Sequence, residues 1–308
     1  MKLVRFVRRR LLRLILTVFI IATMVFFLVR VLPGDPAAVI AGLDADPDSL
    51  AAIRAQQGLD RPLVVQYLDW LWSALRFDFG RSFFSNEPAM ALIMRRLPLT
   101  LLLSLLAFVA SVAIAVPLGV LSAVHRWGPI DYAGMVFSQF GMALPGFWLG
   151  ILLLLVFSVH LRWFPLFGAD SLRHLVLPAV ALGLGRSALL VRYVRSSTLE
   201  ELGKDYVVTA EAMGIPRSSI RYRHVLKNAL LPVITIAGIQ LGYMLGGTIL
   251  IEQVFSLPGA GRLLLTAIQQ RDFAVIQAGV VFLAVAFSFV NFLADVLYTV
   301  VNPRIRVG

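Results

Sequence analysis

The sequence predicts an all-α membrane protein with six transmembrane helices, and three observations support that prediction. Hydrophobic residues make up 59% of the 308 residues and charged residues only 15%, whereas typical globular chains are about 25% charged. The mean hydropathy is +0.85. Finally, the apolar residues gather in long runs, and the basic residues gather in alternate segments between these runs. This alternation places both termini on the cytoplasmic side of the membrane.

Each predicted span is long enough to cross about 30 Å of hydrocarbon as a helix. The first follows a basic start and continues to about Val29 without a small-residue cleavage site, so it is expected to stay as an uncleaved span. Pro117, Pro145 and Pro178 fall inside or near the ends of spans, where neighbouring helices must satisfy the carbonyl groups that they free. The predicted spans are Leu11–Val31, Leu99–Val124, Ile130–Val159, Leu175–Val194, Leu230–Ile251 and Val275–Val301.

Arginine and lysine residues set the orientation of these spans. The segment 192–227 carries seven basic and four acidic residues, whereas the loop 30–96 balances seven arginines against eight acids. Because basic segments are retained in the cytoplasm, 192–227 is expected inside and the first loop outside. The termini add further basic residues, namely Lys2, Arg5, Arg8, Arg9, Arg10, Arg13, Arg304 and Arg306. The predicted divisions are 1–31 (cytoplasmic N-terminus and first helix), 32–98 (extracytoplasmic subdomain) and 99–308 (the other helices, with a cytoplasmic loop at 200–228).

The loop 32–98 is the polar stretch large enough to form a small subdomain. Its second half, PLVVQYLDWLWSALRF, has the spacing of an amphipathic helix with aromatic residues on one face. Two interpretations stay open. Trp70, Trp72 and Phe77 would dock at the membrane interface, where aromatic rings are favoured, or the helix would offer a docking surface to an external protein.

Signatures of catalysis are absent from the sequence. It contains no GxxxxGK[ST], HExxH or GxSxG motif. The lack of cysteine excludes disulfides, thiolate metal sites and cysteine nucleophiles. The net charge of +11 follows the predicted membrane orientation. No catalytic residue, metal site or nucleic-acid partner is therefore expected, and energy for any active work must come from another protein.

The segment from Tyr206 to Pro232 is a basic, helix-capable stretch between two long apolar spans. Glu200, Glu201 and Asp205 precede a helical run, where negative charge is favourable. Gly214 then interrupts the run, and Pro216 fits the first turn of a second helix. The sequence thus predicts two short helices that meet at a glycine elbow on the cytoplasmic side. The alternative is a solvated basic loop that contacts anionic lipid.

Six motifs in the same order resemble the permease subunits of bacterial ABC importers, specifically the dipeptide, oligopeptide and nickel group, over nearly the whole chain. They are LPGDP at Leu32–Pro36, GLDRPLVVQYLDWL at Gly58–Leu71, DFGRS at Asp78–Ser82, DYVVTAEAMG with HVLKNALLP at His224–Pro232, FSLPGAGRLLLTAIQQRDF at Phe255–Phe273 and NFLADVLYTVVNPRIR at Asn291–Arg306.

The resemblance implies that the cytoplasmic loop holds a coupling helix, which sits in a cleft of an ATPase subunit. Small side chains suit this role, because a helix with a thin face seats closely and transmits a rigid-body shift. The wider importer consensus begins with Glu-Ala-Ala, where this chain has Val208, Thr209 and Ala210, and many peptide-type members carry basic residues in place of Glu211 and Met213. The implied coupling residues are Tyr206, Thr209, Ala210, Glu211, Ala212, Gly214 and Pro216.

The resemblance also implies the partners and the location of the chain. It would be the permease core of an importer in the bacterial cytoplasmic (inner) membrane. Its partners would be a second, related permease subunit, two cytoplasmic ABC ATPase subunits, an extracytoplasmic solute-binding protein and the lipid bilayer. ATP and Mg²⁺ would bind to the ATPase subunits, and this chain is expected to hold no cofactor.

Polar residues within the predicted spans are candidates for the translocation pathway. Arg186 lies about 16 Å into the fourth span at 1.5 Å per residue. A guanidinium there costs roughly 2.5–3.5 kcal/mol on insertion scales, so it is expected to face a cavity or a partner. Asn291 and Asp295 share a helical face, and Asp295 has a structural or coupling role as its alternative. The other candidates, for which close helix packing is the alternative, are Gln240, Tyr243, Met244 and Thr248.

The predicted function is a passive conduit within an ATP-driven importer, with di- or oligopeptides as the expected solute. Nickel complexes, glutathione and sugar-like or opine compounds fit the same scaffold. A secondary transporter would need midplane carboxylates or matching broken helices, and the acids here lie almost entirely outside the predicted spans. An intramembrane hydrolase would need a paired nucleophile and base, which the sequence does not offer.

Overall fold

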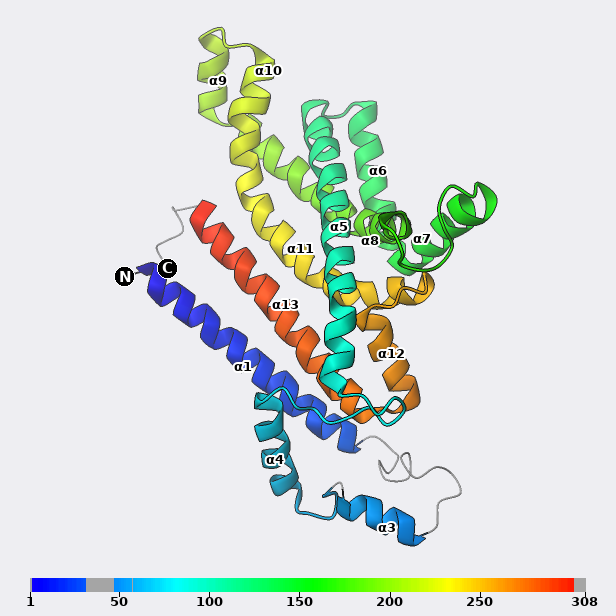
Figure 1. Cartoon of the computed structure of the whole chain (residues 1–308). Coiled ribbons are helices and arrows are strands. Elements are labelled where there is room, and N and C mark those ends of the chain that lie inside the picture. The colour runs from blue at the N-terminus through cyan, green and yellow to red at the C-terminus, as the bar shows by residue number, and fades with distance from the viewer. Residues whose placement is uncertain (1, 32–46, 57, 302–308) are drawn as a thin grey trace.

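The computed structural model describes residues 2–31, 47–56 and 58–301 as an elongated helical protein (Figure 1). Five helical segments in this part of the chain are long and apolar enough to cross a membrane, and one bent helix pair would supply a sixth. The expected all-helical membrane architecture is therefore confirmed. The motif at Leu32–Pro36 and the last residues of the C-terminal motif, 302–306, lie outside the described residues.

The first and last long helices lie side by side. Helix α1 (Lys2–Val31) runs along α13 (Phe273–Val301), and the start of α1 lies near the end of α13 (Figure 1). Arg10 of α1 forms an ion pair with Asp295 of α13, with 2.7 Å between Nη1 and Oδ2. Asp295 therefore joins these two helices.

Three long helices form the centre of the molecule: α5 (Ala89–Val124), α8 (Leu172–Leu202) and α11 (Leu226–Val254). Their buried side chains include Leu103, Leu182 and Met244. Gly119 of α5 allows a close approach to α8, because a Cβ at that position would lie 2.6 Å from the Cβ of Val194. Helix α5 begins at Ala89, ahead of the hydropathy boundary at Leu99, and it carries Pro98 within its length.

The run from Ile130 to Val159, expected as one span, is broken. Helix α6 (Pro129–Ala143) and the pair α7 (Gly146–Leu153) with the π-helix η1 (Leu154–His160) meet at an angle of 104°. The break lies at Leu144 and Pro145, whose backbones are extended with ψ angles of 129° and 131°. A residue before proline is driven out of the α region, and proline itself lacks the N–H that would continue the helix.

The region that we expect on the extracytoplasmic side packs on α1, α5 and α13. It contains α3 (Pro47–Gln56), α4 (Leu63–Leu75) and, after α11, helix α12 (Ala260–Gln270). Trp70 of α4 packs against Phe26 of α1 with 5.2 Å between ring centroids. The Trp70 ring therefore belongs to the contact between α4 and α1, and docking of the three aromatic residues at the membrane interface stays a prediction. Trp72 and Phe77 are 59% and 68% exposed.

Candidate functional site

The elbow that we expect on the cytoplasmic side, called the cytoplasmic elbow, is made by α9 (Asp205–Ala212) and the turn Met213–Pro216. Gly214 has a φ of +75°, a left-handed conformation that glycine adopts without a steric penalty. The predicted bend at Gly214 is confirmed. The second arm is not a separate short helix as expected: α10 (Arg217–Ser219) continues through the π-helix η2 (Ile220–Val225) into α11. Pro216 stands just before α10, with a φ of −56°.

The inner face of the elbow is a small apolar core. Val207 of α9 is buried against Ile220 and Val225 of η2. Tyr206 donates a hydrogen bond from its hydroxyl to Oε2 of Glu201, at 2.9 Å, and burial raises the pKa of the Tyr206 phenol. The Ala210 side chain packs against the same core. Two of the predicted coupling residues, Tyr206 and Ala210, thus lie in the contacts that hold α9 against η2, which continues into α11.

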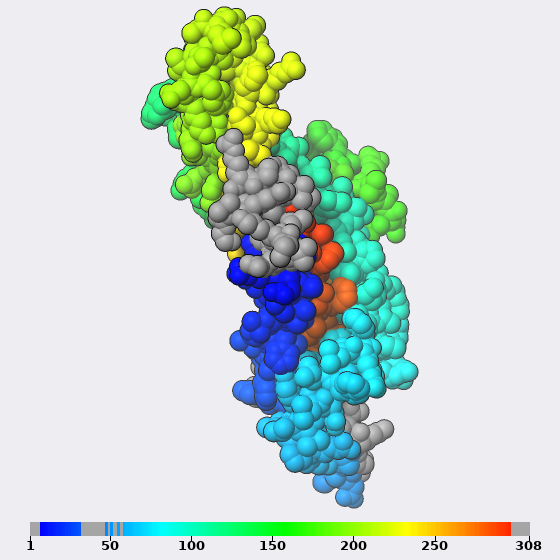
Figure 2. Space-filling view, turned by 90° about the vertical axis from the view of Figure 1, so that its left-hand side faces the viewer, coloured from blue at the N-terminus to red at the C-terminus, as the bar shows by residue number. Residues whose placement is uncertain are grey.

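The outer face of the elbow is exposed and partly apolar. Val208 and Met213 are 64% and 75% exposed, and the small residues Thr209 and Ala212 lie beside them in the chain, also exposed. Figure 2 shows the yellow-green α9 segment projecting from one end of the molecule. An exposed apolar surface on a projecting, well-mounted element is typical of a protein–protein contact.

Glu211 and Arg217 pair across the elbow. Oε1 of Glu211 lies 3.3 Å from Nε of Arg217, and the two side chains are 46% and 74% exposed. Since the pair spans the turn at Gly214, it links α9 to α10 at the surface. Glu211, which stands where many peptide-type members carry a basic residue, therefore has an ionic contact within this chain.

A buried ion pair joins the cytoplasmic ends of α6 and α8. The Asp131 carboxylate is fully buried and accepts two hydrogen bonds from Arg195, at 2.5 and 2.7 Å, and one from the Trp127 backbone at 3.0 Å. Breaking such a pair costs about 3–5 kcal/mol, because it leaves a buried charge without a partner. Sequence reasoning missed this clamp, since the two residues lie 64 positions apart.

An open cavity of about 470 Å³ lies where α8 and α11 face the bend between α6 and α7. Arg186 of α8 and Gln240 of α11 both line it, beside Pro145 of the bend. The Arg186 guanidinium carbon lies 5.7 Å from the centre of the Tyr243 ring. Gln240 is only 3% exposed, and its Nε2 has no hydrogen-bond partner among the described residues.

The other candidate pathway residues lie elsewhere. Met244 and Thr248 are fully buried between the chain's own helices, and the Thr248 hydroxyl donates to the Leu245 carbonyl at 2.8 Å. Asn291 donates from Nδ2 to the Phe287 carbonyl at 3.0 Å on its own helix. Of the seven candidates, the cavity therefore brings together Arg186 and Gln240, with Tyr243 beside them.

A second elbow, missed at the sequence level, joins α11 to α12 at the opposite end of α11. The buried Glu252 carboxylate accepts hydrogen bonds from the Thr100 hydroxyl at 2.6 Å and from the Arg262 backbone at 2.9 Å. The Ala260 backbone in turn donates to the Thr100 hydroxyl oxygen at 2.9 Å. A carboxylate in this position neutralises the positive end of the α12 dipole. The outer elbow is thereby anchored to α5.

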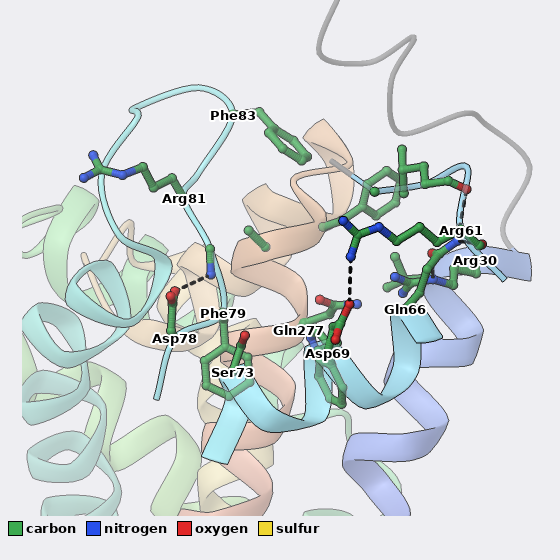
Figure 3. Close-up of a pocket in the computed structure, with 17 residues that line it drawn as sticks. Arg30, Arg61, Gln66, Asp69, Ser73, Asp78, Phe79, Arg81, Phe83 and Gln277 are labelled. Atoms are coloured by element: carbon green, nitrogen blue, oxygen red, sulfur yellow. Dashed lines mark hydrogen bonds and ion pairs between the residues drawn. The ribbon is translucent and has the colours of Figure 1, made fainter. Parts of the chain in front are cut away.

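A pocket of about 430 Å³ opens on the extracytoplasmic side, between the end of α1, helix α4 and the start of α13 (Figure 3). Three arginines line it, and each has a contact within the chain: Arg61 pairs with Asp69 at 3.2 Å, and Arg30 donates to Gln66 Oε1 at 3.1 Å. The third, Arg81, donates to the Asn86 carbonyl at 2.8 Å. These contacts hold the subdomain together.

Two family models match this chain. The family model described as "Binding-protein-dependent transport system inner membrane component" matches residues 115–307, and the model for the N-terminal part of such components matches residues 3–104. The glutathione transport system permease protein GsiC of Salmonella choleraesuis (strain SC-B67) is 42% identical over 301 residues, which is 98% of each chain. Its namesake in Escherichia coli (strain K12) is 41% identical over the same shares.

Solved structures share the fold of the helical core. A chain of the MetNI methionine ABC transporter, in an inward-facing conformation, matches with a TM-score of 0.56 and 20% identity, over 70% of this chain and 99% of that chain. A second crystal form of that transporter gives a TM-score of 0.59 at 21% identity, over the same shares. At this identity the likeness establishes the fold alone.

Proposed function

This chain belongs to the family of binding-protein-dependent transport system inner membrane components, and from that premise we propose that it forms half of a glutathione translocation pathway. It is a multi-pass inner-membrane protein and the permease of an ABC importer, not itself a catalyst. Membership of this family implies ATPase and binding-protein partners. The proposal adds their arrangement: a second, related permease, two ATPase subunits that bind ATP and Mg²⁺, and one external binding protein.

The cytoplasmic elbow carries the coupling part of the proposal. Its apolar outer face, with Val208 and Met213 exposed, is the contact for an ATPase subunit. Its inner core of Val207, Ile220 and Val225 is continuous with the start of α11, so a shift of the elbow moves α11 with it. ATP binding would draw two such elbows together, and hydrolysis would release them. The permease is then a two-state element that ATP biases at one end and the loaded binding protein at the other.

The relatives favour glutathione over the unmodified di- or oligopeptides that the sequence first suggested. Two relatives with matches over 98% of the chain are named as glutathione transport permeases. Glutathione is itself a tripeptide with two carboxylates, so the peptide-transport character of the prediction is kept.

Reconstitution of the complete transporter tests this function. Proteoliposomes that hold both permeases and the ATPases are expected to take up tritiated glutathione only with ATP and the binding protein present. Uptake by this chain alone, without ATP, would refute the importer mechanism. The same uptake assay is repeated with trialanine in place of glutathione. ATP-dependent uptake of trialanine but not of glutathione would exclude the glutathione assignment and keep the importer mechanism.

Replacement of Gly214 tests the elbow. Valine strains a backbone with a φ of +75°, although its Cβ would meet no atom within 4 Å. Gly214→Val is therefore expected to release the ATPase subunits during purification and to abolish uptake. Gly214→Asn is the matched control, because asparagine tolerates the left-handed region. Full ATPase retention and uptake in the valine variant would exclude the elbow as the coupling contact.

A further inference from the structure

The cavity between α8, α11 and the bend after α6 has two polar side chains in an otherwise apolar and glycine-containing lining. Among its described lining residues, these are Arg186 and Gln240. No acidic side chain lines the cavity within the described part of the chain. Its volume of about 470 Å³ falls within the range of roughly 300–1,000 Å³ that is typical of small-molecule sites.

Arg186 is a cation in the middle of a membrane-spanning helix without an anionic partner in the described residues. It lies 14 positions after the start of the 31-residue α8, about 21 Å along the helix axis. Its nearest recorded partner is the face of the Tyr243 ring, 5.7 Å away. Arginine at such depth is retained where it pairs with an anion or faces a water-filled cavity. The partner must come from outside the described part of this chain.

Gln240 supplies a second, independent sign of a missing ligand. Its side chain is 97% buried, and its Nε2 donor has no partner among the described residues. A buried donor without an acceptor is costly, so such groups are rare unless a ligand or water completes them. Arg186 and Gln240 line one cavity from two helices, and a carboxylate is the acceptor that a guanidinium matches with two hydrogen bonds.

Glycines leave room for such a ligand. A Cβ at Gly185 or at Gly146 would meet no atom within 4 Å, and both glycines line the cavity. One precedes Arg186 on α8 and the other begins α7 just after the bend. At these two positions the cavity is therefore not narrowed by a side chain.

We propose that Arg186 and Gln240 form an intramembrane site that binds a carboxylate of the transported solute as it crosses the permease. The inference rests on the proposed function, and it adds the chemical class that the permease itself recognises: a small peptide-like anion. Selection is then shared, because the binding protein chooses the solute and this site requires its carboxylate. The open form of the cavity allows the solute to enter and to leave.

Uptake and ATP hydrolysis, measured together, test this site. The complete transporter is reconstituted with Arg186→Gln, and tritiated glutathione uptake is compared with ATP hydrolysis stimulated by the binding protein. Uptake is expected to fall at least tenfold while stimulated hydrolysis stays within twofold, because docking and coupling are intact. Arg186→Lys is expected to recover part of the uptake, since it restores the charge but not the planar pair of donors. Gln240→Leu is expected to lower uptake about threefold.

Arg192→Gln is the matched control. It removes an arginine from the same helix, six positions away and outside the cavity lining, and it is expected to keep uptake within twofold. Equal uptake by Arg186→Gln and the wild type would overturn the proposal. Loss of the second permease from the purified Arg186→Gln complex would also overturn it, by assigning the guanidinium to a subunit interface. If the wild type imports no glutathione, the solute assignment fails, and the same comparison with trialanine decides whether the site exists.

Discussion

Helix α11 ends in an elbow on each side of the molecule, and the two elbows differ in what they expose. Each turn contains a residue with positive φ, Gly214 on the cytoplasmic side and Ser256 on the outer side, at +75° and +52°. At the outer elbow, Glu252 and Ala260 are fully buried. At the cytoplasmic elbow, Met213 is 75% exposed. One elbow is completed by its own chain, and the other leaves an apolar surface for a partner.

Because of this difference, we expect the outer elbow to determine the stability of the fold and the cytoplasmic elbow to determine coupling. At the outer elbow, Thr100 of α5 and Glu252 of α11 satisfy backbone donors at the start of α12, so substitutions there change the free energy of unfolding. At the cytoplasmic elbow, the exposed side chains contribute little to folding. Substitutions there should change coupling while the chain stays folded. The same rigid helix can then carry movement from the exposed end to the anchored one.

The largest effect is expected from Gly259→Ala in the outer elbow. A Cβ at Gly259 would lie 2.2–2.4 Å from the atoms of the Glu252 carboxylate, which would have to move away from Thr100 and Arg262. The expected loss is about 3–5 kcal/mol of unfolding free energy, because strain adds to unsatisfied buried donors. Thermal unfolding of the purified complex in detergent measures it.

Gly246→Ala is the matched control for that substitution. It makes the same chemical change in α11, where the added Cβ would meet no atom within 4 Å. Because glycine within a helix is less favourable than alanine by roughly 0.5–1 kcal/mol, this variant is expected to be neutral or slightly stabilising. Equal melting temperatures for the two variants would exclude the anchoring role of Glu252.

Met213→Asp probes the exposed elbow and is expected to spare the fold. The side chain is 75% exposed, so the unfolding free energy should change by less than about 0.5 kcal/mol. Placing a charge in an apolar contact surface should lower binding-protein-stimulated ATP hydrolysis at least fivefold. Ser85→Asp adds the same charge at an exposed extracytoplasmic position, and it should leave hydrolysis unchanged. A loss of melting temperature that matches the loss of hydrolysis would contradict the distinction between the two elbows.

The sequence predicts features that depend on local patterns, and it does not predict contacts between residues far apart in the chain. The two elbows show this difference. Hydropathy marks the spans, and a glycine followed by a proline two positions later marks the cytoplasmic bend. The bond between Thr100 and Glu252 joins residues 152 positions apart, and no local pattern indicates such a pair. Pro145 lies inside the run expected as one span, and the 104° bend there depends on how α7 packs against α8 and α11.

For the candidate site, too, the sequence indicates the residue types but not their positions in the fold. The polar residues of α11 were recognised by type, but a helix that is apolar around most of its circumference does not indicate which face meets the protein. Gln240, Met244 and Thr248 recur every four positions and lie on one face, which is buried. Gln240 alone of the three reaches the cavity lining. It lines the cavity together with the bend after α6, whose position no local pattern around Gln240 indicates.

The smallest effect is expected from Glu211→Gln, which removes the ion pair with Arg217 across the cytoplasmic elbow. Both side chains are exposed, at 46% and 74%, and exposed pairs are typically worth about 0–1 kcal/mol and weaken with salt. The unfolding free energy should fall by less than about 0.5 kcal/mol, and this difference should vanish in 1 M salt. ATP hydrolysis should fall less than with Met213→Asp, because the apolar surface remains. A larger functional loss with Glu211→Gln would mean that the carboxylate, and not the apolar face, is the main contact of the ATPase.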